Sequence, residues 1–187
     1  QEYYANTNTK QFYLELWGED SIHIGLYEEN YNYNDNKEQK IKDIKTAINK
    51  KKEYMVNYIK RYCNFKDTLN ISDFGSGFGG TSRYIYNKLN KTNNLIIDNF
   101  DISNDNCEIN IKKNIEQNMN INVYNMSFLN THKPNNYYDI IYSEDSFIHI
   151  NNRNLIFEEI NRILKKDGIL IFSDIILTDQ YNKNNIN

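Results

Sequence analysis

Residues 70–84, NISDFGSGFGGTSRY, decide the fold of this chain. A short apolar segment runs into four glycines within six residues and then continues with a helical pattern. Glycines at positions 75, 77 and 80 predict a backbone with positive φ that comes close to a ligand. The following helix directs its free N–H groups and positive dipole end at that ligand. We therefore interpret the stretch as a strand, a turn that holds a nucleotide, and a helix.

The glycine spacing also fits Gly-x-Gly-x-x-Gly, a pattern of dinucleotide-binding proteins. Asp73 precedes the first glycine by two residues, and a carboxylate at this strand tip would repel a pyrophosphate. The same carboxylate suits a ligand that carries an ammonium and a sulfonium, as S-adenosylmethionine does. We expect this cofactor, and an NAD-dependent oxidoreductase is the alternative from another class.

Two further segments accompany the glycine-rich stretch. Residues 12–18 and 22–27 read FYLELWG and IHIGLY, and residues 138–149 read YDIIYSEDSFIH. Together with residues 71–84 they resemble the sarcosine/dimethylglycine N-methyltransferases, and the third segment is also similar to the phosphoethanolamine N-methyltransferases. The resemblance implies a class I methyltransferase that uses S-adenosylmethionine to methylate a small amine such as glycine, sarcosine or dimethylglycine. Phosphoethanolamine methylation and an inactive S-adenosylmethionine-binding fragment are the alternatives.

Composition limits the class of protein. The chain has 187 residues, 39% of them hydrophobic, and this length suits a single domain. A net charge of −3 gives no basic stripe for nucleic acid, and two cysteines with three histidines give no zinc framework, so we expect no metal. No stretch is long and apolar enough for a membrane span, and we expect a cytoplasmic protein.

Alternating patterns predict an α/β fold with a mostly parallel sheet and helices on both faces, Rossmann-like in the manner of class I methyltransferases. We expect strands at residues 69–74, 95–101, 121–126, 138–143 and 168–174, and helices at 38–62, 80–89, 105–117 and 152–164. Within one domain, 1–187, residues 1–66 form an N-terminal cap and 67–187 the core. The family's C-terminal hairpin strands are missing from this prediction, and the exposed sheet edge predicts self-association.

Ligands of open α/β sheets bind at the carboxyl ends of the strands. Asp101 stands 21 residues past Gly80, the spacing of an acidic residue that accepts ribose hydroxyls, although Asp101 or Ser103 could instead be the N-cap of a helix. Ser127 and Phe128 follow the third strand, where the resemblance implies contacts with adenine. The ring of Phe128 would stack on the base or pack in the core. The expected cofactor-binding residues are Asp73, Gly75, Ser76, Gly77, Gly80, Arg83, Asp101, Ile102, Ser127, Phe128 and Glu144.

Asp145 and His149 stand four residues apart, so in a helical turn the carboxylate could orient the imidazole. The phosphoethanolamine methyltransferases have a matching catalytic pair, and the resemblance makes His149 the expected base and Asp145 its support. The resemblance also implies that Tyr4 closes over the methyl donor. We expect Trp17 and Tyr27 to hold the substrate cation by cation–π contact, and His23 to bind the substrate carboxylate.

Overall fold

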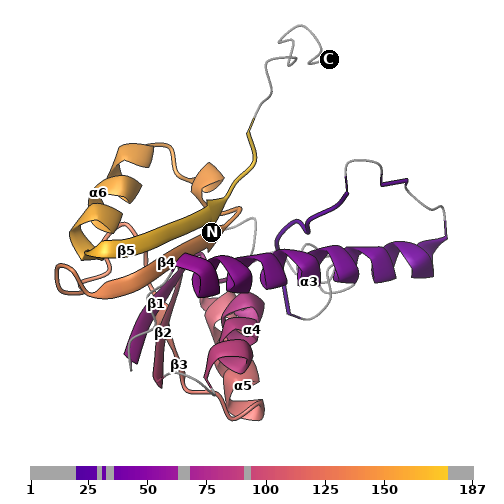
Figure 1. The fold of residues 1–187 in the computed structure, drawn as a ribbon, viewed down its shortest axis with the longest axis horizontal. Helices are drawn as coiled ribbons and strands as arrows, with labels where there is room; N and C mark the ends of the chain where they lie inside the picture. Colours follow the sequence, from indigo (N-terminus) through magenta and orange to yellow (C-terminus); the bar gives the residue numbers. More distant parts are fainter. Residues whose placement is uncertain (1–19, 29–30, 33–35, 63–67, 91–93, 177–187) are drawn as a thin grey trace, which may run out of the picture.

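The fold is given by a computed structural model that describes residues 20–28, 31–32, 36–62, 68–90 and 94–176. The strands of these residues form one parallel sheet in the order β3-β2-β1-β4-β5 (Figure 1). They are β1 (Thr68–Phe74), β2 (Asn94–Asp101), β3 (Ile121–Asn125), β4 (Tyr138–Glu144) and β5 (Leu164–Ser173). The strand order reverses between β1 and β4, and open α/β sheets bind their ligands at such a switch point.

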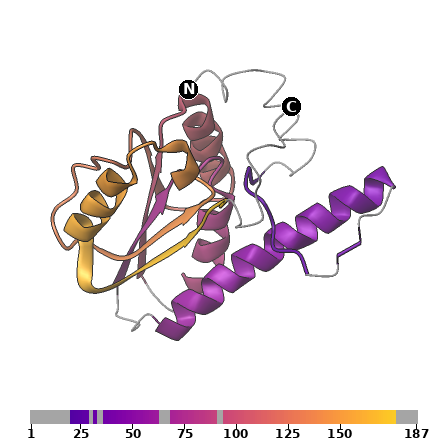
Figure 2. The ribbon, with the colours of Figure 1, turned by 90° about the horizontal axis from the view of Figure 1, so that it is seen from above.

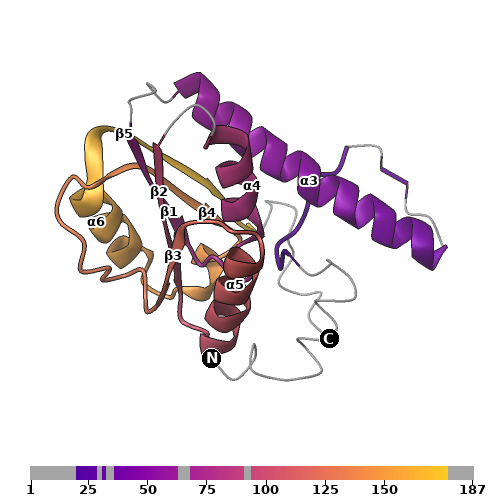
Figure 3. The same cartoon turned by 90° about the horizontal axis from the view of Figure 1, so that it is seen from below.

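Helices cover both faces of the sheet. One face carries α3 (Lys37–Tyr62), α4 (Gly80–Leu89) and α5 (Asn104–Glu116), and the other carries α6 (Arg153–Ile163) (Figure 2). A short 3₁₀ turn, η1 (Phe147–His149), follows β4. The amino-terminal half of α3 extends beyond the sheet (Figure 3). The expected fold class is confirmed: this is the Rossmann-like class I methyltransferase fold.

Each face of the sheet has its own hydrophobic core. On one face, Val56 and Ile59 of α3 and Ile85 of α4 are buried against the sheet. On the other face, Ile156 and Ile160 of α6 pack with a group of aromatic side chains. Both faces of β1 and β4 are covered, and all seven residues of β4 are buried. The central strands are therefore buried on both faces, as is usual for parallel sheets, although both also carry buried polar side chains.

The predicted elements agree with the observed ones to within one or two residues, with one exception. β5 begins at Leu164, four residues before its predicted start, because α6 leads directly into it. Its early residues pair with Tyr138 before a register shift. β5 is the edge strand of the described sheet, and most of its residues are only partly buried. Among the described residues, no helix is long and apolar enough to cross a membrane.

Candidate active site

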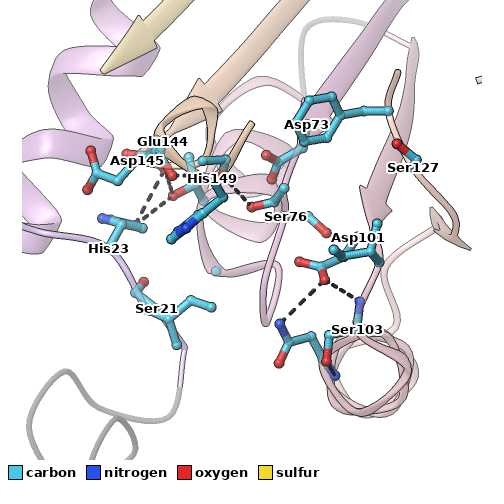
Figure 4. A pocket seen from close by; sticks show the side chains of 18 of the residues that line it. Ser21, His23, Asp73, Ser76, Asp101, Ser103, Ser127, Glu144, Asp145 and His149 are labelled. Atoms are coloured by element: carbon cyan, nitrogen blue, oxygen red, sulfur yellow. Dashed lines mark hydrogen bonds and ion pairs between the residues drawn. The ribbon is translucent and has the colours of Figure 1, made fainter. Parts of the chain in front are cut away.

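One pocket lies at the carboxyl ends of the strands (Figure 4). Its wall comes from the loops after β1, β2, β3 and β4, together with residues 20–23 of the N-terminal segment. The expected cofactor residues that line it are Asp73, Gly75, Ser76, Gly80, Asp101, Ile102, Ser127, Phe128 and Glu144. Topology therefore brings residues from four separate loops to one place, as the switch-point rule predicts.

The turn after β1 contains three left-handed glycines. Gly75, Gly77 and Gly79 have φ values of 77°, 51° and 75°. The sequence-based assignment of positive φ to Gly80 was wrong, because Gly80 is the first residue of α4 and Gly79 makes the turn. Gly80 is required for another reason: a Cβ there would lie 2.1 Å from the carbonyl oxygen of Asp20. The N-terminal segment therefore packs directly on the start of α4.

Asp101 ends β2 and is held by backbone amides. Its Oδ2 accepts the N–H of Gly77 at 2.8 Å, and its Oδ1 accepts that of Ser103 at 2.8 Å. Burial raises the pKa of Asp101, and these hydrogen bonds oppose the rise. Gly77 itself is not part of the pocket wall; it positions Asp101. The capping alternative is confirmed at Ser103, which is the N-cap of α5, while Asp101 lies outside the cap position.

Asp73 lies at the floor of the pocket and faces a polar network in the core. The hydroxyl of Tyr142 donates to its Oδ2 at 2.8 Å, and Ser82 Oγ lies 2.9 Å away. Burial raises the pKa of Asp73 to about 7. Near neutral pH the carboxyl group of Asp73 is therefore partly protonated.

Phe128 serves the core and the pocket together. Its ring stacks on Phe74 with 4.9 Å between centroids and an interplanar angle of 12°. It also lines the pocket with Ser127, the first residue beyond β3 in this wall. Both interpretations of Phe128 from the sequence are thus compatible with its position.

The loop after β4 carries Glu144, Asp145 and His149 into the pocket. Asp145 has a left-handed φ of 55° and precedes the 3₁₀ turn, so the two side chains do not share a helical face. Its carboxylate instead accepts the N–H of Ile24 at 2.9 Å and contacts Lys51 Nζ at 3.1 Å. The described partners of this carboxylate are thus Lys51, the Ile24 amide and the Ser173 hydroxyl, and not His149 as expected.

Glu144 is buried at the contact between the loop after β4, α4 and the N-terminal segment. Thr81 Oγ1 donates to its Oε2 at 2.5 Å, and His23 Nε2 lies 3.4 Å from the same oxygen (Figure 4). His23 is also buried, and desolvation lowers its pKa although Glu144 opposes this shift. A neutral imidazole thus reaches the pocket from the N-terminal segment.

Besides Gly77, two expected ligand residues in the described part of the chain lie outside the pocket wall. Arg83 is buried beneath the glycine turn, where it donates to Asn110, Asn114 and the carbonyl of Phe78 and pairs with Asp20 at 3.0 Å. The described contacts of its guanidinium are thus with the protein, and Arg83 does not line the pocket where it was expected to bind the cofactor.

Tyr27 is the second such residue. It packs against Tyr31, with 5.0 Å between ring centroids, and not against the pocket. Its predicted place in a substrate-binding wall was therefore wrong for the described conformation. Tyr4 and Trp17 lie outside the described residues.

Several pocket residues were missed in the sequence. Thr81 follows the glycines directly and Asn106 stands in the first turn of α5, so their places after two strand ends were a usable signal. Lys51 does not line the pocket but contacts its residue Asp145, and the sequence gave no signal of this contact. It stands 94 residues before Asp145 in the chain, and only folding brings the two together.

Comparisons with known proteins agree with this geometry. A sequence model described as a methyltransferase domain matches residues 72–172, more than half of the chain. The sarcosine/dimethylglycine N-methyltransferase of Aphanothece halophytica is 30% identical over 96% of this chain and 59% of its own length. The glycine/sarcosine/dimethylglycine N-methyltransferase of Actinopolyspora halophila is 28% identical over the whole chain and 30% of its own length.

A solved structure assigned as a sarcosine dimethylglycine methyltransferase from Galdieria sulphuraria has a TM-score of 0.74 at 27% identity. The match covers 92% of this chain and 60% of that one. The chain thus spans less than two thirds of the length of these relatives. The sequence match, the sheet order and the pocket agree, and the chain belongs to the methyltransferase domain family.

Proposed function

We propose that the pocket binds S-adenosylmethionine and that the chain belongs to an N-methyltransferase of a small amine such as sarcosine or dimethylglycine. The observation that carries the proposal is the charge of the pocket wall. Among the described residues, no lysine or arginine lines it, and its carboxylates are Asp20, Asp73, Asp101, Glu144 and Asp145. An acidic pocket attracts a sulfonium and an ammonium and disfavours a pyrophosphate or a phosphoethanolamine.

The acidity remains after ion pairs are considered. Asp20 pairs with Arg83, and Asp145 pairs with Lys51, so these two carboxylates are largely compensated. Asp101 accepts hydrogen bonds from backbone amides, and among the described residues Glu144 has only Lys51 and His23 within ion-pair distance. Asp101 and Glu144 therefore carry most of the uncompensated negative charge, because the pKa of Asp73, raised to about 7, leaves that carboxyl group partly protonated near neutral pH.

The residues present fit the cofactor. Asp101 at the end of β2 is suited to accept ribose hydroxyls, and Phe128 offers a ring edge for adenine. The left-handed glycines let the backbone at Gly75 approach a ligand closely. When bound, S-adenosylmethionine supplies an activated methyl group on its sulfonium.

The amine needs a lone pair, so an ammonium substrate must first lose a proton. His149 reaches the pocket and is our proposed base, without Asp145 as its partner. The choice of sarcosine or dimethylglycine is supported by the names of the relatives, which are 25–30% identical to this chain over 95–96% of it. Removing the base should therefore affect turnover more than donor binding.

Calorimetric titration with S-adenosylmethionine and with NAD, followed by transfer of a labelled methyl group to sarcosine, dimethylglycine and phosphoethanolamine, tests the proposal. We expect binding of S-adenosylmethionine, weak or absent binding of NAD, and methylation of the two glycine derivatives. In His149→Ala, we expect turnover to fall while the donor Kd is retained. Tight NAD binding without S-adenosylmethionine binding would refute the assignment.

A further inference from the structure

Glu144 has one satisfied and one unsatisfied carboxylate oxygen. Its Oε2 accepts from Thr81 at 2.5 Å, but its Oε1 is buried and has no hydrogen-bond partner among the described residues. The side chain is only 6% exposed, and the residue lines the pocket. The described structure therefore leaves a buried acceptor at the pocket wall.

The neighbouring cation does not supply the missing donor. Lys51 Nζ lies 3.9 Å from Oε1, beyond hydrogen-bond distance. Its own hydrogen bonds go to the carboxylate of Asp145 and to the carbonyl oxygen of Ile24, at 3.0–3.2 Å. His23 contacts the other oxygen of Glu144. The ammonium of Lys51 is thus committed elsewhere, while its charge still stabilises the buried carboxylate.

Burying a carboxylate oxygen without a donor costs free energy. A ligand that supplies a charged N–H group to this oxygen removes that cost and gains a strong hydrogen bond. Thr81 and His23 contact one oxygen of Glu144 and leave the other without a donor, in a residue that lines the pocket. We propose that Oε1 of Glu144 accepts a hydrogen bond from the ammonium group of a bound ligand. This inference rests on the proposed function and assigns one contact within it.

Two ligands of the proposed reaction carry such a group: the donor has an α-ammonium, and the amine substrate has its own N–H. Glu144→Gln removes the charge and keeps the shape of the side chain. Calorimetry compares S-adenosylhomocysteine, which has the α-ammonium, with 5′-methylthioadenosine, which lacks the amino-acid portion. Steady-state kinetics give the KM for sarcosine.

If the donor is the source, Glu144→Gln weakens S-adenosylhomocysteine binding roughly 10- to 100-fold and leaves methylthioadenosine binding unchanged. If the substrate is the source, the Kd of S-adenosylhomocysteine is retained and the KM for sarcosine rises by a similar factor. The inference is wrong if both quantities match those of the unaltered chain. It is also wrong if the two nucleosides lose affinity by the same factor.

Glu158→Gln is the matched control, because it makes the same chemical change at an exposed position of α6 and should change neither quantity. A thermal melt establishes that Glu144→Gln is folded. If it is not, Glu144→Asp keeps the charge but withdraws it from the pocket by one methylene, and the same loss is expected. Failure of the unaltered chain to bind S-adenosylmethionine would instead refute the proposed function.

Discussion

Asp73 is enclosed by protein at the end of β1, and burial raises its pKa to about 7 from the 3.8 of an unperturbed aspartate. Between these two values the native state holds a proton that the unfolded chain has lost. Native stability therefore falls as pH rises from about 4 to about 7 and then levels off. The cause is the cost of burying the ionised form near Glu144 and Asp101.

Asp73→Asn cannot ionise and should remove this part of the pH dependence. Urea unfolding at pH 5 and pH 7.5 measures the effect, with the unaltered chain losing more stability between the two than the variant. Asp167→Asn, at an exposed position of β5, should behave like the unaltered chain. Equal pH dependence in all three proteins would show that Asp73 does not titrate in this range.

Gly77 combines a left-handed φ of 51° with close packing, since a Cβ would lie 2.7 Å from Cδ1 of Ile22. Gly77→Val should shift the turn and its amide bond to Asp101, while Asp101→Ala removes the carboxylate itself. We expect each variant to bind S-adenosylmethionine roughly tenfold more weakly or worse. Calorimetry checks this result, and retained affinity in both folded variants would contradict the proposed placement of the ribose.

The path of the N-terminal segment, residues 20–26, could not be predicted from the sequence. Its path is fixed by Asp20 against Gly80 and Arg83, and by Leu26, whose N–H donates to the carbonyl of Ala47 in α3. Gly25 lies so close to Ala47 that a Cβ there would be 2.6 Å from it. The segment is thus a close-packed strap that closes one side of the pocket.

Arg83→Met tests the structural role of this arginine. Loss of its guanidinium leaves Asn110, Asn114 and the Phe78 carbonyl without a donor, so unfolding free energy should fall by about 2–4 kcal/mol. Lys88→Met, on the same helix but half-exposed, should cost less than about 1 kcal/mol. Denaturant unfolding gives both values. Full stability of Arg83→Met with lost donor binding would restore the ligand role of Arg83.

At the scale of the whole molecule, the edge strand β5 and its surroundings are unusually apolar for a surface. Phe157 and Phe172 are each nearly half exposed, with 6.3 Å between their ring centroids, and Ile175 and Ile176 follow in the chain. β5 pairs with β4 alone among the described strands. Such an edge favours pairing with another chain.

We therefore expect the purified 187-residue chain to self-associate in a concentration-dependent manner. Phe172→Lys, which places a charge beside the edge, should lower that association without changing donor binding, because Phe172 is not part of the pocket wall. Sedimentation velocity over a concentration series measures the self-association of both proteins. A chain that stays monomeric throughout the series would contradict this expectation.

The sequence by itself determined the strands, the helices and the position of the glycine turn, because apolar periodicity and glycine content are local properties of the chain. It also predicted Asp101 and Glu144 at the pocket, since residues that end parallel strands meet at one edge of the sheet.

Only the tertiary structure decided what each charged group contacts. Asp145 pairs with Lys51, 94 residues away, and Arg83 turns from the pocket toward α5 and Asp20. Position 80 is a glycine because the strap packs against it and leaves no room for a Cβ, although Gly80 itself is helical. These outcomes depend on which distant groups satisfy a buried charge, and local spacing holds no information about partners brought together by folding.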